Sequence, residues 1–364
     1  MKSHYLKRMK RVRAVLAARG LDAFLVTCPE NRRYLSGFTA EDVGISESAG
    51  ALLILRKEAI LLTDGRYEVQ ARNEAPDWRL VIYRRGLAHA LKNLMHDRSV
   101  HNLAYEPVFL SCQRLDAIKK ALPETKFVSL GGRIETMRSI KSSSEIESLK
   151  KAISAAEKVL GDIWKNIRPC MTEKEIAWRI IEGLWQHAEG PSFSPIVASG
   201  PNAALPHAVP TDRPIGEGKP ILIDMGAKLG GYCSDMTRTI FLGEPRPPFR
   251  EIYAIVRKAQ VAAQNAIKAG LTGKQVDQVA RDIIKDAGYG PRFVHSLGHG
   301  VGLAVHEAPI LSQRSRKKLR PGMVVTVEPG IYLPDQGGVR LENMALVEAD
   351  GAVILSKNDW FYEF

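Results

Sequence analysis

Residues 221–239 read ILIDMGAKLGGYCSDMTRT and residues 323–343 read MVVTVEPGIYLPDQGGVRLEN, and these two stretches decide the fold of the second half of the chain. In each stretch an apolar run ends in an acid, turn residues follow, and a second acid lies four residues after a Gly-Gly pair. Apolar runs separated by turn residues predict β-hairpins. The sequence therefore predicts two hairpins with one acid on each strand, and the four acids are Asp224, Asp235, Glu328 and Glu342.

The two hairpins belong to an internal repeat. With an offset of 100 residues, Thr172 falls over Thr272, and after a slip of one residue the motif at residues 207–210 (HAVP) falls over residues 306–309 (HEAP). Each half reads as two helices, a glycine-rich segment with a histidine, and a hairpin. The repeat predicts two similar halves packed around a pseudo-two-fold axis, with the matching acids converging from opposite sides.

The hairpin acids predict a cation site. If Leu229-Gly230 forms a two-residue turn, Asp224 lies directly opposite Asp235, with Cβ atoms about 4.5–5.5 Å apart. The second hairpin repeats this arrangement around a loop centred on Asp335. Carboxylates this close repel each other unless a cation lies between them. Four carboxylates and one imidazole suit a pair of borderline cations such as Mn²⁺, Co²⁺, Fe²⁺ or Zn²⁺.

The imidazole candidates lie mainly in residues 295–309, HSLGHGVGLAVHEAP. His299 takes the place that Ser199 has in the first half, so it is the asymmetric addition and the expected ligand. His207 and His306 are related by the repeat, and we expect them to contact the substrate or to support the ligands. A single histidine would more simply be a core residue, but three in one constellation favour a site.

Length and composition predict two domains. At 364 residues the chain exceeds one typical domain, and we place the boundary near residues 130–140. The first part alternates helix and strand, with a basic amphipathic helix over residues 1–20 and strands in DAFLVTC, ALLIL and EAILLT. A long helix is predicted from the serines at residues 142–144 onward.

Several function classes are disfavoured by composition. The chain has no run of about 18 apolar residues, which predicts no membrane-spanning helix, and we expect a cytoplasmic protein. The four cysteines show no CxxC spacing, so we expect buried reduced thiols and neither disulfides nor a thiolate zinc site. The net charge of +12 raises a nucleic-acid alternative, but the basic residues are dispersed. A solvated basic face that attracts anionic peptides is the preferred interpretation, with no nucleic-acid partner.

At these residues the chain resembles the pita-bread metallopeptidases, in the branch of aminopeptidase P and prolidase. The motifs that carry the resemblance are PHAVP, IDMGAKLGGYCSDMTRT, LGHGVGLAVHE, GMVVTVEPGIY and GVRLEN in the second part, and NRRYLSGF, TDGRYEVQA and MRSIKSSSEIE in the first. The resemblance implies an α/β creatinase-like N-terminal domain over residues 1–135. It also implies an α+β pita-bread catalytic domain with the pseudo-two-fold repeat over residues 136–364.

The resemblance implies roles for individual residues and two divalent metal ions per chain, with Mn²⁺ as the expected metal. Asp224 would hold one metal through both oxygens, Asp235 and Glu342 would bridge the two, and His299 and Glu328 would complete the other. His207 and His306 would bind the substrate and the tetrahedral intermediate, with Arg340 behind them and Glu328 as proton acceptor. The chain departs from the family pattern at Asn343, where an aspartate is expected, and at Ala304, where many relatives carry an acid.

The implied activity is hydrolysis of the peptide bond before proline in small peptides, by a homodimer or higher homo-oligomer. An Xaa-Pro aminopeptidase is the preferred interpretation. A prolidase restricted to dipeptides is the alternative, with Arg314 as the group that would bind the terminal carboxylate. Because Arg314 lies in the basic segment SQRSRKKLR, it could equally be a solvated loop residue. A non-catalytic pita-bread binding protein is disfavoured, since all five ligand positions are occupied by ligand residues.

Overall fold

The structure is a computed structural model that describes residues 3–44, 47–96 and 98–364. The chain divides into two compact units between Met137 and Arg138, two residues after the boundary that the resemblance implies. The helix predicted over residues 1–20 begins and ends at Ser3–Ala18, and residues 1 and 2 lie outside the described part of the chain.

The N-terminal unit is built on one mixed six-stranded sheet with the order β4-β3-β2-β1-β5-β6. Its strands are β1 (Ala23–Val26), β2 (Ala51–Leu55), β3 (Ala59–Thr63), β4 (Arg79–Ile82), β5 (Asn102–Tyr105) and β6 (Lys126–Ser129). Its helices are α1 (Ser3–Ala18), α2 (Pro29–Ser36), the 3-10 turn η1 (Gly65–Tyr67), α3 (Glu68–Glu74), α4 (Leu87–Met95), α5 (Cys112–Ala121) and α6 (Arg133–Arg138), whose last residue already belongs to the C-terminal unit. The three runs predicted as strands are β1, β2 and β3, which confirms the α/β prediction.

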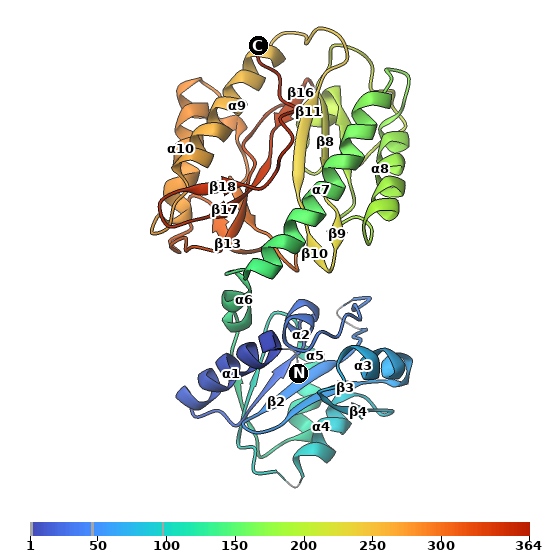
Figure 1. Ribbon diagram of the computed structural model, residues 1–364, viewed down its shortest axis with the longest axis vertical. Helices are drawn as coiled ribbons and strands as arrows, with labels where there is room; N and C mark the ends of the chain where they lie inside the picture. Colours follow the sequence, from blue (N-terminus) through green and yellow to red (C-terminus); the bar gives the residue numbers. More distant parts are fainter. Residues whose placement is uncertain (1–2, 45–46, 97) are drawn as a thin grey trace. The chain divides into compact units, whose positions relative to one another are not determined.

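The C-terminal unit places two pairs of helices around short twisted sheets (Figure 1). The helices are α7 (Ser143–Asn166), α8 (Glu173–His187), α9 (Phe249–Ala266) and α10 (Gly273–Asp286), with 3-10 turns η2 (Gly200–Ala204) and η3 (Gly290–Arg292). The first half contributes β7 (Ile196–Ser199), β8 (Ile221–Met225) and β11 (Met236–Ile240), and the small ribbon β9 (Lys228–Leu229) and β10 (Tyr232–Cys233). The second half contributes β12 (Gly298–Gly300), β13 (Glu307–Leu311), β14 (Val324–Val327), β17 (Asn343–Val347) and β18 (Ala352–Ile354), and the ribbon β15 (Gly330–Leu333) and β16 (Gly337–Arg340).

The predicted repeat is visible in how the helices begin and what they cover. Both α8 and α10 start with a capping box, in which Thr172 and Thr272 cap the main chain three residues later and Glu175 or Gln275 bonds back. Buried apolar side chains of α7 and α8 pack against β7, β8 and β11. Those of α9 and α10 pack against the strands of the second half. Each half therefore buries its sheet under its own helix pair, as the pita-bread resemblance implies.

The predicted register of the first hairpin is wrong by two residues. The turn is Gly230-Gly231 and not Leu229-Gly230, because Leu229 pairs with Tyr232, and both glycines adopt the positive φ that a type I′ turn requires. Asp224 consequently lies opposite Thr237 and not opposite Asp235. A shift of two residues keeps every side chain on its face, so both acids still point to the same side of the hairpin.

The second hairpin has the predicted register. Its loop is centred on Asp335, which adopts φ 63°. The pairs Val327 with Asn343 and Gly330 with Arg340 lie on either side of the two acids. Counting between them places Glu328 opposite Glu342.

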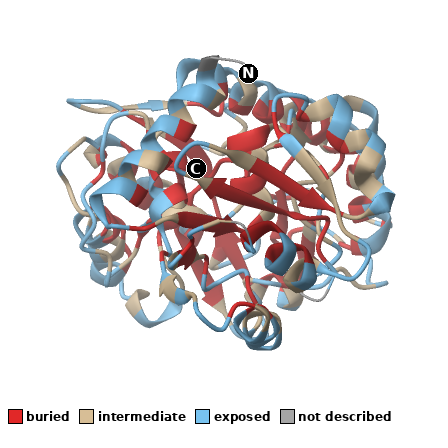
Figure 2. Cartoon of the chain, turned by 90° about the horizontal axis from the view of Figure 1, so that it is seen from below, coloured by how far each residue is buried: buried red, intermediate tan, exposed pale blue. Residues whose placement is uncertain are grey.

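The core lies on the strands and on the inward faces of the helices (Figure 2). All residues of β8 and β11 are buried. Within the described residues, no helix has both the length and the apolar character that a membrane crossing requires. All four cysteines are free thiols, but the expectation that they are buried is wrong for Cys112 and Cys170. Cys112 begins α5 and Cys170 lies in the turn before α8, where one side of the chain faces solvent.

Candidate active site

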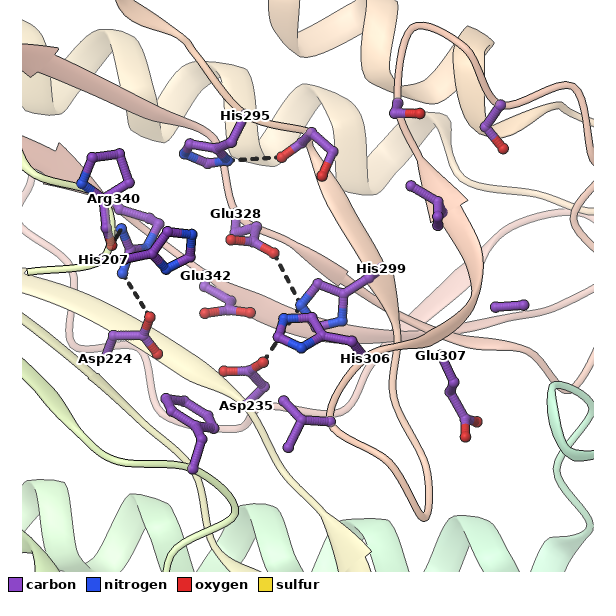
Figure 3. Close-up of a pocket in the computed structure, with 18 of the residues that line it drawn as sticks. His207, Asp224, Asp235, His295, His299, His306, Glu307, Glu328, Arg340 and Glu342 are labelled. Atoms are coloured by element: carbon purple, nitrogen blue, oxygen red, sulfur yellow. Dashed lines mark hydrogen bonds and ion pairs between the residues drawn. The ribbon is translucent and has the colours of Figure 1, made fainter. Parts of the chain in front are cut away.

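The five predicted cation ligands lie together in a cavity of about 980 Å³ in the C-terminal unit (Figure 3). The two hairpins and the glycine-rich segment supply them from different strands. The candidates are Asp224 on β8, Asp235 just before β11, His299 on β12, Glu328 just after β14 and Glu342 just before β17. The repeat thus brings its matching acids to one place.

Three of these residues lie close enough together to share one cation. One ligand atom each from Asp235, His299 and Glu342 lie within 4.8 Å of one another. His299 Nε2 lies 3.6 Å from Asp235 Oδ2 and 3.3 Å from Glu328 Oε1. Oxygen and imidazole donors grouped in this way are the set that borderline divalent cations take.

The buried carboxylates have few cationic or hydrogen-bonding partners for their negative charges. Among the described residues, the buried oxygens Asp224 Oδ1 and Glu342 Oε1 have no hydrogen-bond partner. Burial, followed by the charges of Glu342 and Asp224, raises the pKa of Asp235 well above its ordinary value. Burial, followed by the charges of Glu328 and Asp224, does the same to the pKa of Glu342. Buried anions with free acceptor oxygens are costly unless a cation binds them, so the residues fit divalent ions.

The orientation of the His299 ring suits a metal ligand. Its Nδ1 lies 3.1 Å from the Gly300 carbonyl oxygen. Because that oxygen can only accept, Nδ1 donates its proton there and Nε2 faces the carboxylates. Burial alone would lower the pKa of His299 and raise that of Glu328. Their mutual hydrogen bond and opposite charges outweigh burial, so the pKa of His299 is raised and that of Glu328 is lowered.

A threonine that the sequence analysis did not single out orients one of the carboxylates. Thr237 Oγ1 donates to Glu342 Oε2 at 2.7 Å and accepts from Arg340 Nε at 3.1 Å. Thr237 is fully buried. Thr237, in the first half of the repeat, therefore connects Arg340 to Glu342, both of which lie in the second half.

A second threonine, Thr326, orients another of the carboxylates. Thr326 Oγ1 donates to Glu328 Oε1 and accepts from the main-chain N–H of His299, both at 3.0 Å. Thr237 lies two residues after Asp235, and Thr326 lies two residues before Glu328. Alternate residues of a strand share a face, so the spacing itself was a signal that could have found both threonines.

Arg340 is buried and lines the cavity beside Asp224. Its Nη2 donates to Asp224 Oδ2 at 2.6 Å, and its Nη1 donates to the Pro206 carbonyl at 3.1 Å and to the Tyr332 hydroxyl at 2.9 Å. The same hydroxyl lies 2.8 Å from His295 Nε2. Burial raises the pKa of Tyr332 to about 12, so the hydroxyl stays protonated. Tyr332 and His295 are further site residues that the sequence analysis did not assign.

The two repeat-related histidines line the cavity and are exposed to solvent there. The rings of His306 and His299 lie 4.2 Å apart between centroids. His207 lies beside Arg340 (Figure 3). Burial, followed by the nearby charge of His299, lowers the pKa of His306. Each histidine can therefore reach a substrate held against the carboxylates.

The remaining predicted residues have clear positions. Arg314 is exposed and lines the cavity, together with Arg316 and Lys317. Asn343 is buried and its Oδ1 accepts from Arg238 Nη2 at 3.0 Å. The Ala304 carbonyl accepts the Gly302 main-chain N–H at 3.0 Å, which closes a tight loop before His306.

Known proteins match this chain over nearly its whole length. Residues 147–349 match the Metallopeptidase family M24, and residues 8–140 match the Creatinase/Prolidase N-terminal domain. The chain is 35% identical over 356 residues to the Xaa-Pro dipeptidase of Pyrococcus furiosus, covering 97% of this chain and 98% of that protein.

Solved structures show the same relationship. The Xaa-Pro dipeptidase from Bacillus anthracis superposes with a TM-score of 0.91 at 40% identity, covering 97% of this chain and 98% of that one. The X-Pro aminopeptidase from Thermotoga maritima superposes with a TM-score of 0.84 at 38% identity, covering 93% and 96%. Together with the cluster of carboxylates and histidine on the two hairpins, these matches establish that the chain belongs to metallopeptidase family M24 and carries the Creatinase/Prolidase N-terminal domain.

Proposed function

We propose that this metallopeptidase hydrolyses the peptide bond before proline and releases the N-terminal residue, as an Xaa-Pro aminopeptidase. The relatives of the chain support this choice of bond, since they include both Xaa-Pro dipeptidases and an X-Pro aminopeptidase. The cluster of five ligand residues in one cavity supports the chemistry.

The family implies divalent metal ions, and the five residues of the cluster would hold two of them. We propose Asp224, Asp235, His299, Glu328 and Glu342 as the ligands, with Mn²⁺ as the metal, because the donors are mainly carboxylates with one imidazole. When bound, the ions supply a nucleophilic water near neutral pH and a Lewis acid for the peptide carbonyl. The two unpartnered buried oxygens, Asp224 Oδ1 and Glu342 Oε1, support this assignment.

The surrounding residues supply proton transfer and orientation. The lowered pKa of Glu328 keeps its carboxylate ionised, so it can accept a proton from the attacking water. The lowered pKa of His306 keeps its ring neutral at pH 7, and its remaining N–H can donate to the carbonyl oxygen as charge develops there. His207, on the opposite side of the cavity, would hold the substrate. Arg340 fixes Asp224 and neutralises part of the cluster.

The extent of the cavity supports peptides longer than two residues. A second, more open cavity of about 700 Å³ adjoins the first. The two share His295, Ser296, Ser312 and Arg314 in their walls. A peptide that places its scissile bond at the carboxylates would therefore have room for residues beyond proline. The position of this second cavity next to the first is the observation on which the aminopeptidase proposal depends.

Substrate length is the direct test of the proposal. The purified protein loaded with Mn²⁺ should release alanine from Ala-Pro-Ala and from Ala-Pro-Ala-Ala, and it should leave Ala-Ala-Ala largely intact. Chelation should abolish the activity, and Mn²⁺ should restore it. Failure to cleave any Xaa-Pro peptide would refute the function, whereas cleavage of Ala-Pro alone would refute only the preference for longer peptides.

An Xaa-Pro dipeptidase is the second candidate, and the position of Arg314 favours it. The guanidinium lines the cavity and could pair with the terminal carboxylate of a dipeptide, a contact worth about 1.5–3 kcal/mol. If so, Arg314→Ala should lower kcat/KM for Ala-Pro by roughly tenfold to a hundredfold and scarcely affect Ala-Pro-Ala. We expect the other outcome, a small change for both peptides, because the side chain is exposed.

A further inference from the structure

Beside the cavity, the carboxylate of Glu307 is held by two buried cations. Its Oε2 accepts from Arg138 Nη2 at 2.5 Å, and its Oε1 accepts from Lys141 Nζ at 2.7 Å. The side chains of all three residues are no more than 4% exposed. Burial lowers the pKa of Lys141, and the charge of Glu307 opposes that shift. Both carboxylate oxygens are thus fixed by charge-assisted hydrogen bonds in a water-poor environment.

Glu307 directly follows His306, and the two side chains point in opposite directions. His306 points to the carboxylate cluster, whereas Glu307 points away from it (Figure 3). Glu307 begins β13, where it pairs with Gly300 of β12 next to an irregularity in the register. His306 lies in the bend immediately before this strand, so an anchor on Glu307 also restricts where His306 can lie.

The loop that precedes His306 is packed against the same carboxylate. A Cβ atom on Gly302 would lie 2.3 Å from Glu307 Oε1, so the main chain of this loop lies directly on the anchored group. The loop is closed by the hydrogen bond from the Gly302 N–H to the Ala304 carbonyl. Lys141 is itself held, because its main-chain N–H donates to the Gly322 carbonyl at 2.8 Å. The anchor therefore connects the histidine loop to a fixed part of the unit.

We propose that Glu307, held by Arg138 and Lys141, is a positioning residue that sets the place of the His306 ring over the carboxylate cluster. The proposal rests on the role of His306 as a donor to the substrate carbonyl. A catalytic group displaced by about 1 Å can cost about 10²-fold in rate. The ion pairs remove the freedom that a glycine-rich loop would otherwise give to that ring.

A double-mutant cycle between Glu307 and His306 tests the proposal. Glu307→Gln in the Mn²⁺-loaded protein should lower kcat for Ala-Pro-Ala by roughly tenfold to a hundredfold, with KM and Mn²⁺ content nearly unchanged. In a His306→Ala background the same substitution should change kcat by less than about twofold, because the residue it positions is gone. Glu182→Gln on the exposed face of α8 is the matched control, and it should have no effect in either background.

Four results would overturn the inference. They are an unchanged kcat in Glu307→Gln, equal losses in both backgrounds, a loss of bound Mn²⁺, or a loss confined to KM. An unchanged kcat in His306→Ala alone would instead refute the donor role in the proposed function. If Glu307→Gln does not fold, the cycle is run on Glu307→Gln with Lys141→Met, which removes the surplus buried cation. The same non-additivity with His306→Ala is then expected, and additive losses there refute the proposal.

Discussion

Replacing Asp235 by asparagine should change stability in opposite directions with and without metal. The carboxylate is nearly buried, and one of its oxygens groups with ligand atoms of His299 and Glu342 within 4.8 Å. Burial and the neighbouring carboxylates raise its pKa well above the ordinary value. Asparagine has nearly the same shape but no charge. It should therefore relieve repulsion in the metal-free protein and weaken cation binding.

The magnitude with metal follows from linkage. A cation that binds only the folded state at 100 times its Kd adds about 2.7 kcal/mol to the free energy of unfolding. For a domain of about 150–250 residues this corresponds to roughly 5–11 °C in Tm, at about 2–4 °C per kcal/mol. Wild-type protein should show this increase on adding Mn²⁺, and twice the free energy if two ions bind. Asp235→Asn should lose the contribution of at least one ion.

The metal-free effect has a definite sign with pH. A carboxyl group whose pKa is raised by folding binds more protons in the folded state than in the unfolded state. Wild-type stability due to Asp235 should therefore fall as the pH rises from its unfolded pKa of about 4 towards the raised folded value. Asparagine does not titrate, so the metal-free variant should unfold at a higher temperature than wild type, by a margin that grows with pH.

Calorimetry with and without chelator, together with metal analysis by atomic emission, measures both effects. Asp212→Asn is the matched control, since that carboxylate is mostly exposed and pairs with Lys174 on the surface. If Asp235→Asn retained two ions per chain and hydrolysed Ala-Pro-Ala near the wild-type rate, its assignment as a ligand would be wrong. A metal-free variant less stable than wild type at pH 8 would contradict the repulsion argument.

Two further predictions concern other groups. His299→Ala should lose bound Mn²⁺, whereas His207→Ala should retain it and lower kcat by about 10²-fold, the scale of one lost transition-state contact. Metal analysis and steady-state kinetics measure both effects, and loss of metal in His207→Ala but not in His299→Ala would contradict the assignment. In the N-terminal unit, burial raises the pKa of Glu106 to about 7, so its contribution favours folding below about pH 4.5 and is lost as the pH rises to about 7. Glu106→Gln should flatten the Tm profile across that window, and an unchanged slope in calorimetry would refute the pKa.

The fold was largely predictable because its signals are local or repeated. The long helix predicted after the serines at 142–144 is α7, with Ser142 as its cap. The offset of 100 residues located α8 and α10 through their threonine caps. The first hairpin was misread because Leu229-Gly230 and Gly230-Gly231 are both plausible turns. Only the second pair supplies two residues that tolerate positive φ.

The acids of the site could be predicted from the sequence, but most of the residues that hold them and the histidines in place could not. Acids in matching places of a repeat can be recognised in the sequence. Tyr332 and His295, in contrast, come into contact because separate segments converge in space. The anchor on Glu307 was equally hidden, since Arg138 and Lys141 lie more than 160 residues away in sequence. Contacts of this kind depend on tertiary packing, and no spacing in the sequence encodes them.

The two halves supply matching acids, but the side chains that hydrogen-bond or pair with those acids differ between the halves. This difference makes the site asymmetric. The second half alone supplies His299, Thr326 and Arg340, while the first supplies Thr237. Arg340 crosses to the first half and neutralises Asp224, whereas His299 and Thr326 both bond Glu328 of their own half. The acids related by the repeat therefore differ in basicity, as the lowered pKa of Glu328 and the raised pKa of Asp224 indicate. Two cations bound here would be inequivalent, and the proposed proton acceptor, Glu328, would be the acid of its repeat-related pair that stays ionised.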